Sequence, residues 1–384
     1  MTRDELDLAI VGAGIVGAAC AFAAANEGLR VAIVDSGPPA GGTTSAGMGH
    51  VVALDSSPQV LALARYSQRL WREIGPHLPP SAGYRESGTL WIAGSEEELQ
   101  IAERRSETLH AAGIPAERLD PEEIAVMEPL LREGLHGGLL VPEDLLVDPP
   151  AATRYLLDIV RDRGGRIELG RTVRAIRPGR IEGDLGFELR ARGVVNAAGV
   201  RAPELTPRVP IAPRKGHLLH LQGGRERIRH QVVELRYGAG VRSSEPVAVA
   251  FNLHPRADGS VLVGASRETG PRDGAVDPAV VERLRAKVRE FAPRLDSWPT
   301  LGAWTGLRPA SADHLPWIGP WPEEPGVWLA TGHEGLGVTA ALGTGRLLVD
   351  QFLGRPTAIP AEPYRPTAER IARTASGPAP EDAR

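Results

Sequence analysis

The stretch LDLAIVGAGIVGAACAFAAANEGLRVAIVD, residues 6–35, decides the fold of this 384-residue chain. Residues 6–11 are apolar except for one aspartate and predict a short buried strand, and residues 31–34 predict a second strand. Between them, the alanine-rich residues 18–27 predict a helix, which ends at Gly28 as helices commonly end at glycine. Strand, helix and strand in this order predict a Rossmann-like βαβ unit.

The loop between the first strand and the helix, GAGIVG at 12–17, has the spacing of a dinucleotide-binding motif. Gly12 permits the tight turn, Gly14 lets the backbone approach a pyrophosphate, and Gly17 lets the helix pack closely on the strand. The helix N-terminus then offers free N–H groups to the phosphates. Asp35 ends the second strand, where it is placed to accept hydrogen bonds from ribose hydroxyls. The unit predicts an ADP-containing cofactor and does not by itself separate FAD from NAD.

Composition is that of an ordinary globular protein. The chain is 42% hydrophobic and 24% charged, and its length predicts about two or three domains or lobes. A net charge of −4, without a long basic run, disfavours nucleic acid as a partner. The single cysteine, Cys20, excludes an internal disulfide and a cysteine-held iron–sulfur cluster or zinc ion. Its apolar neighbours predict a packed core thiol, and no metal-ligand spacing is evident.

Residues 9–25 carry no charged side chain and invite comparison with a signal peptide or membrane span. The residues before them are mainly acidic, which is the wrong sign for a signal peptide. The stretch is also shorter than the roughly 20 apolar residues of a typical span. We therefore expect a soluble, cytoplasmic protein with no transmembrane segment.

A different pattern follows the βαβ unit. Residues 84–93 predict a strand, and residues 211–263 contain several β-type runs with a hairpin signal at Asp258-Gly259. These runs predict an antiparallel sheet. The last 15 or so residues of the Pro- and Ala-rich tail are expected to be disordered. Further helices are predicted over residues 59–74, 96–112, 149–163 and 278–291.

The second informative region lies towards the C-terminus. GLRP at 306–309 is followed by a predicted strand at 327–330, the turn TGHEGLG at 331–337 and a predicted helix at 338–352. A strand that enters such a turn directs a helix N-terminus at something anionic, such as the N1/C2=O side of a reduced flavin. Plain packing of a strand and a helix would give the same pattern, so this segment alone leaves both interpretations open.

Together these motifs resemble the D-amino-acid oxidase-like (DAO) family of FAD-dependent oxidoreductases over residues 6–353. The resemblance rests on GAGIVG, Asp35, GTTSAG at 42–47, VVNAAG at 194–199, GLRP and TGHEGLG. Within the family, the chain is most similar to the D-hydroxyproline (D-proline) dehydrogenases. The stretches that carry this finer similarity are AGMGHVVALD at 46–55, PRKGHLL at 213–219, VAFNLHPR at 249–256 and TGHEGLGVT at 331–339.

The resemblance implies two domains and FAD as the cofactor; we expect the FAD to be bound non-covalently, and covalent attachment through a histidine stays open. A discontinuous FAD-binding domain is expected from residues 1–82, 146–210 and 301–354, and an antiparallel-sheet substrate domain from residues 83–145 and 211–300, followed by a tail at 355–384. The residues expected to contact FAD are Gly12, Gly14, Ile15, Val16, Gly17, Asp35, Ser36, Thr43, Thr44, Ser45, Ala46, Gly47, Met48, Val173, Ala197, Ala198, Gly199, Gly306, Arg308, Gly332, His333, Glu334, Gly335, Leu336, Gly337, Val338 and Thr339.

The implied reaction is oxidation of the C–N bond of a small amino acid, with hydride transfer from Cα to the flavin giving an imine. Arg308 is the expected anchor of the substrate α-carboxylate, because guanidinium binds carboxylate bidentately and Arg308 matches the family's GLRP arginine. Glycine oxidase-like members carry another arginine in the turn where this chain has residues 334–336, Glu-Gly-Leu. This departure favours a bulkier or cyclic substrate, such as D-proline or cis-4-hydroxy-D-proline.

Two histidines complete the expected catalytic set. His333 is placed to border the flavin or the substrate, although it serves equally well as a capping histidine, and His50 is a further possible site residue with a weaker claim. Lys215 and Tyr237 are weaker candidates for the site. For Tyr237 the reason is that a tyrosine in a sheet is more often a packing residue.

Other functions stay open. A glycine/sarcosine-type amine oxidase would share the motifs, and a flavin monooxygenase would share the first unit but needs a nicotinamide site. The chain could also be the flavin subunit of a multi-subunit amino-acid dehydrogenase, with any iron–sulfur cluster on its partner. The electron acceptor, oxygen or a carrier, and the oligomeric state are not predicted.

Overall fold

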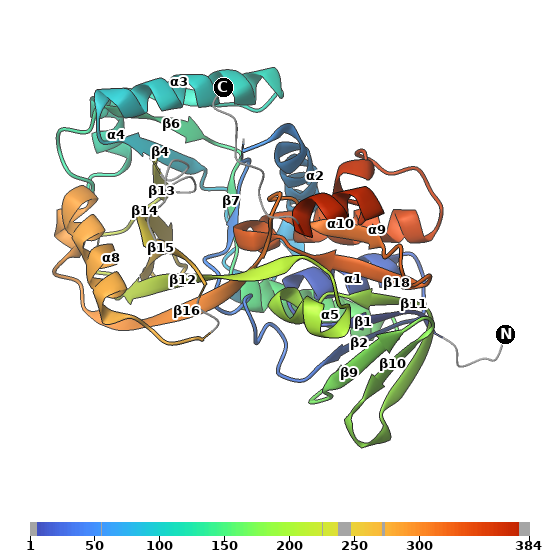
Figure 1. Cartoon of the computed structure of the whole chain (residues 1–384). Coiled ribbons are helices and arrows are strands. Elements are labelled where there is room, and N and C mark those ends of the chain that lie inside the picture. The colour runs from blue at the N-terminus through green and yellow to red at the C-terminus, as the bar shows by residue number, and fades with distance from the viewer. Residues whose placement is uncertain (1–5, 55, 225, 237–246, 271–272, 376–384) are drawn as a thin grey trace.

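The computed structural model describes residues 6–54, 56–224, 226–236, 247–270 and 273–375. Two large sheets with helices packed around them form the framework (Figure 1). Within the described ranges, no helix combines the length and apolar character needed to cross a membrane. Tyr237 lies outside the described residues, so its predicted role is not addressed.

The first sheet contains the predicted βαβ unit. Its strands in the described part of the chain are β1 (Leu6–Val11), β2 (Val31–Asp35), β8 (Arg166–Leu169), β9 (Val173–Arg177), β10 (Arg180–Gly183), β11 (Glu188–Asn196), β17 (Trp317–Pro320) and β18 (Val327–Thr331). The main order is β17-β18-β11-β1-β2-β8, and β10 joins β11 to β9. Strand β1 pairs in parallel with β2 and β11, and β11 with β18, which confirms the Rossmann-like prediction.

Helices lie beside this sheet, and two of them pack closely where small residues meet. The helices are α1 (Ile15–Asn26), α2 (Pro58–Ile74), α5 (Pro149–Asp162) and α9 (Gly337–Phe352), and α1 contacts both α5 and α9. A Cβ on Gly345 of α9 would lie 2.4 Å from the Ala19 carbonyl oxygen of α1. Cys20 is fully buried there, and burial raises the pKa of its thiol to about 12, as expected of a core cysteine.

The second sheet is largely antiparallel, as predicted. Its described strands are β4 (Thr89–Ala93), β5 (Glu117–Leu119), β6 (Gly137–Val141), β12 (Ile211–Leu221), β13 (Gln231–Glu234), β14 (Val247–Pro255), β15 (Val261–Thr269) and β16 (Thr300–Ser311). Their order is β16-β12-β15-β14-β13-β4-β6-β5, with β13 and β4 parallel. Helix α8 (Pro278–Phe291) packs on β12, β14 and β15, while α3 (Glu96–Ala111) and α4 (Pro121–Met127) lie beside β4 and β6 (Figure 1).

The division into domains stays a prediction. Strand β16 pairs along its length with β12 of the second sheet, whereas residues 301–354 were assigned to the FAD-binding domain. Small elements link the two sheets. They are β3 (His50–Val51), which pairs with β7 (Leu145–Leu146), and the short helix α6 (Ala202–Leu205).

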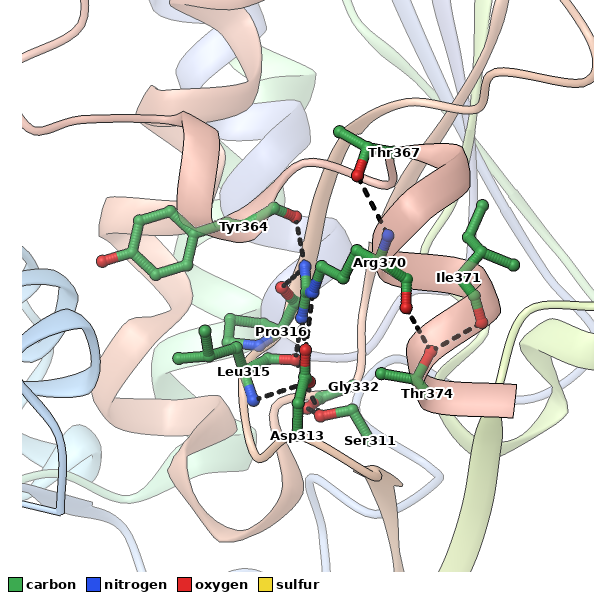
Figure 2. A network of polar contacts seen from close by, with 10 residues as sticks. All are labelled: Ser311, Asp313, Leu315, Pro316, Gly332, Tyr364, Thr367, Arg370, Ile371 and Thr374. Atoms are coloured by element: carbon green, nitrogen blue, oxygen red, sulfur yellow. Dashed lines mark hydrogen bonds and ion pairs between the residues drawn. The ribbon is translucent and has the colours of Figure 1, made fainter. Parts of the chain in front are cut away.

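The tail is more ordered than predicted, because one arginine anchors it. Helix α10 (Ala368–Ala375) carries Arg370, which is only 4% exposed. Its guanidinium binds both carboxylate oxygens of Asp313 and donates to the carbonyls of Leu315, Pro316 and Tyr364 (Figure 2). The expected disorder of the last 15 or so residues is therefore wrong for residues 370–375; residues 376–384 lie outside the described ranges.

Candidate functional site

A cavity of about 460 Å³ is lined by residues of both sheets. Most of the predicted contact residues line it. They are Gly12, Gly14, Ile15, Val16, Asp35, Ser36, Thr43, Thr44, Ala46, Gly47, Met48, His50, Val173, Ala197, Ala198, Gly199, Gly306, Arg308, His333, Glu334, Gly335, Gly337 and Val338. Five predicted residues are not among the lining residues: Gly17, Ser45, Gly332, Leu336 and Thr339.

Backbone crowding builds one end of the cavity. Gly12 has φ +108°, and a Cβ there would lie 2.4 Å from the carbonyl oxygen of Ala197. A Cβ on Gly17 would lie 1.9 Å from the carbonyl oxygen of Gly12. Gly17 therefore acts by letting α1 pack on the β1 turn and not by facing the cavity, which is why it is absent from the lining.

The loop after β2 closes over the N-terminus of α1. The Thr44 hydroxyl oxygen accepts a hydrogen bond from the Ile15 backbone N–H at 3.0 Å. A Cβ on Gly14 would lie 3.1 Å from the same hydroxyl, so a side chain here would crowd the Thr44 contact. The free N–H groups of the helix and this loop form a setting suited to a diphosphate.

Asp35 is fixed at the carboxyl end of β2. Its Oδ2 accepts from the Ala13 N–H at 2.7 Å and its Oδ1 from the Gly37 N–H at 2.8 Å. Two carboxylate oxygens offer about four acceptor sites, so ribose hydroxyls can still donate to them. The glycine turn, the helix N-terminus and this acid together fit the ADP half of FAD.

Arg308 lies at the other end of the cavity, on β16. Its Nη1 donates to the Ser266 carbonyl at 3.0 Å. The guanidinium lies across Gly216 of β12, where a Cβ would be 2.3 Å from Nη2. Among the described residues, no carboxylate forms an ion pair with Arg308, although it lines the cavity, so its charge is available to a ligand.

The two predicted histidines are neutral; His333 is buried, and His50 is half-buried with its Nε2 atom buried. Burial lowers the pKa of both His50 and His333 to about 3. The ring of His333 bonds through Nε2 to the Thr344 hydroxyl at 2.8 Å and does not cap the short helix η6 (Glu334–Leu336), which disfavours the capping interpretation. His50 stacks on His254 with ring centroids 5.1 Å apart. Both line the cavity, and their catalytic roles stay a prediction.

Two other predicted residues act elsewhere. Lys215 is absent from the cavity lining, and its ammonium pairs instead with Asp273 at 3.0 Å. The Thr339 hydroxyl donates to the His50 carbonyl at 2.9 Å, so it joins α9 to β3 and is not part of the cavity lining.

Glu334 lines the cavity and has a strongly lowered pKa. Burial alone would raise its pKa, but the hydrogen bond with His314 and the charges of Arg267 and Arg214 outweigh burial and lower the pKa to about 2. The backbone of Glu334 has a φ of +49°, in the left-handed region. The sequence predicted Glu334 as a cofactor contact and gave no sign of its two arginine partners.

Several lining residues were not predicted from the sequence. Asn252 of β14 is 5% exposed, and its Oδ1 is buried with no hydrogen-bond partner among the described residues. The quoted VAFNLHPR stretch contains Asn252 and His254, and the stacking of the His254 ring on His50 joins this strand to the cavity. The remaining unpredicted lining residues are Val11, Val34, Gly37, Pro38, Gly41, Gly42, Gly49, Arg171, Thr172, Val200, Arg201, Glu204, Leu205, Gly216, Leu218, Ala265, Pro309, Ala330 and Thr331.

Comparisons with known proteins agree with this geometry. The DAO family model, described as FAD dependent oxidoreductase, matches residues 7–351. The chain is 28% identical over 376 residues to glycine oxidase of Geobacillus kaustophilus, covering 93% of this chain and 96% of that protein. It is 30% identical over 315 residues to D-amino acid dehydrogenase of Xylella fastidiosa, covering 79% and 70%. The crystal structure of the Geobacillus kaustophilus glycine oxidase matches with a TM-score of 0.85 at 27% identity, over 95% of this chain and 99% of that one.

The chain therefore belongs to the DAO family of FAD-dependent oxidoreductases, which confirms the family-level resemblance found in the sequence. It is an FAD-dependent enzyme whose cofactor chemistry is redox chemistry.

Proposed function

We propose that this enzyme oxidises the C–N bond of a small cyclic D-amino acid, such as D-proline or cis-4-hydroxy-D-proline, to the cyclic imine. The observation that carries the proposal is Arg308, a cavity-lining guanidinium with no carboxylate partner in the described part of the chain. Guanidinium binds a carboxylate in a fixed, bidentate geometry, so it would hold an amino acid by its α-carboxylate. The relatives named glycine oxidase and D-amino acid dehydrogenase support an amino-acid substrate.

The protein's own groups suit this reaction. When bound, FAD supplies the hydride acceptor, and the chain supplies binding and orientation. The nucleotide half of FAD would be held by the β1–α1 turn and Asp35, leaving Arg308 to position the substrate. His50 and His333 are uncharged near neutral pH, so they place no cation beside the substrate amine, which must be neutral to react.

The turn after β18 supports a substrate larger than glycine. Gly335 carries no side chain, and a Cβ at this position would lie 3.9 Å from Arg308 Cδ. Gly335 therefore places no side chain beside the arginine, in the turn where glycine oxidase-like family members carry a second arginine. A five-membered ring attached to the anchored carboxylate would occupy that space.

Anaerobic titration of the purified flavoprotein tests the proposal. The panel contains D-proline, cis-4-hydroxy-D-proline, sarcosine, glycine and D-alanine, with the L-isomers of the chiral members as controls. We expect the visible flavin band to bleach with the cyclic D-amino acids. Bleaching by sarcosine or glycine alone would replace the proposal with the glycine/sarcosine-type alternative, and bleaching by none of them would reject both.

A further inference from the structure

Three arginines gather at the same end of the second sheet. Arg214 of β12 lies directly opposite Arg308 of β16 in the antiparallel register, and Arg267 lies on the neighbouring strand β15. Side chains at opposed antiparallel positions have Cβ atoms about 4.5–5.5 Å apart, and like charges there destabilise the pair. This cluster therefore requires negative charge, either from the protein or from a ligand.

Glu334 supplies one negative charge to two of the three arginines. Its Oε1 accepts hydrogen bonds from Arg214 Nη1 and Arg267 Nη2. All three side chains are less than one-fifth exposed, at 18%, 19% and 18% for Arg214, Arg267 and Glu334. Among the described residues, Glu334 is the carboxylate that pairs with Arg214, whose Nε is buried without a partner.

The three arginines differ in whether they line the cavity. Glu334 and Arg308 line the cavity, whereas Arg214 and Arg267 do not. The glutamate thus covers two guanidinium groups and leaves the third, Arg308, available to a ligand.

The position of Glu334 is fixed from its other side. His314 Nδ1 lies 3.3 Å from Glu334 Oε2. His314 follows Asp313, which is held by the buried guanidinium of Arg370 (Figure 2). The carboxylate is therefore held between the second sheet and an anchored loop, and it cannot leave its arginines without breaking contacts on both sides.

We propose that Glu334 is a specificity-determining residue that acts as a built-in carboxylate, restricting the cavity to substrates with one carboxylate. It occupies Arg214 and Arg267, so a dicarboxylic amino acid would bring its second carboxylate against Glu334 and find those arginines already paired. Rejection of a competitor by a misplaced like charge is a common source of specificity. The inference rests on the proposed amino-acid substrate, because it assumes that Arg308 receives the first carboxylate.

Ligand binding to Glu334→Gln, in which the charge is lost and the shape kept, tests this inference. The probes are two compounds that cannot be oxidised, glutarate with two carboxylates and pyrrole-2-carboxylate with one. Binding to the flavoprotein is measured by calorimetry and by perturbation of the flavin spectrum. We expect glutarate to bind the variant at least about tenfold more tightly than the native enzyme, with pyrrole-2-carboxylate changed by less than about threefold.

Three further variants locate the effect. Arg214→Met combined with Glu334→Gln should reduce the gain, because one of the guanidinium groups that pair with Glu334 is removed. Glu234→Gln is the matched control, since Glu234 is a buried carboxylate paired with Lys287 and absent from the cavity lining. If Glu334→Gln does not fold, Glu334→Gly replaces it, because glycine adopts the φ of +49° without strain.

Unchanged glutarate affinity in both Glu334 variants would overturn the inference, as would an equal gain for both probes or a gain that is undiminished without Arg214. These readouts need no turnover. A native enzyme that no cyclic D-amino acid reduces would therefore refute the proposed substrate while leaving the glutarate result to decide the role of Glu334.

Discussion

The two ends of the cavity are built from different parts of the polypeptide. At the nucleotide end, the turn at residues 12–17 acts through its backbone, and glycines are needed because main-chain atoms occupy the space of a Cβ. At the Arg308 end, charged side chains from β12 and β15 pair with a carboxylate from the turn after β18, which lines the cavity with Arg308 of β16. The first end fits a group that many flavoproteins share, and the second can change by single substitutions, so specificity is expected to lie there.

The largest effect is expected from breaking the backbone end. Gly12→Leu would place a Cβ 2.4 Å from the Ala197 carbonyl oxygen at a φ of +108°. We expect nearly complete loss of bound flavin, measured as the flavin-to-protein ratio after purification. The control is Gly28→Ala, at φ +75° with nothing within 4 Å, which should cost about 1 kcal/mol and retain flavin. A flavin-replete Gly12→Leu would show that the turn is not the cofactor site.

The next largest effect is expected from removing Arg370, which holds the Asp313 loop behind the Arg308 end of the cavity. Arg370→Met leaves the Asp313 carboxylate, 19% exposed, without its partner. We expect the free energy of unfolding to fall by about 3 kcal/mol, measured by denaturant or thermal unfolding of the flavoprotein. Arg373→Met, an exposed position on the same helix, should change stability by less than about 0.5 kcal/mol. Equal effects at the two positions would show that the anchoring contacts are unimportant.

A smaller effect is expected from displacing Arg308 without removing it. Gly216→Ala places a Cβ 2.3 Å from Arg308 Nη2 and should push the guanidinium off the strand. We expect the D-proline concentration for half-maximal flavin reduction to rise about tenfold, with flavin content unchanged. Gly302→Ala on β16, where nothing lies within 4 Å, is the control. If Gly216→Ala leaves the half-maximal concentration unchanged, or if both variants raise it equally, the position of Arg308 does not determine substrate binding.

The buried His333 predicts that stability depends on pH. The folded-state pKa of His333 is about 3, against an ordinary value of 6.5. Between these values the unfolded chain binds a proton that the folded chain does not, so stability falls as pH is lowered, by about 1.4 kcal/mol per pH unit for each such histidine. His333→Gln should therefore reduce the slope of melting temperature against pH between pH 6.5 and 4. Parallel slopes for the variant and the native enzyme would contradict this.

The two ends of the cavity also differ in how much of each could be predicted from the sequence. The βαβ unit was predicted because GAGIVG, its flanking strands and Asp35 lie within residues 6–35, so local spacing carries the signal. Arg308 was predicted from its motif. Gly216, Asn252 and the partners of Glu334 were missed because strand pairings join residues far apart in the chain. Arg370 was missed because the charge and proline of the tail resemble disorder, and five hydrogen bonds override that composition.

Removing the guanidinium of Arg308 tests the central claim most directly. In Arg308→Met, we expect flavin to bind normally while the D-proline concentration for half-maximal anaerobic reduction rises by about 100-fold or more, since a charged hydrogen-bonded partner is lost. Normal flavin content with an unchanged half-maximal concentration would contradict the claim, because the substrate carboxylate would then be held elsewhere.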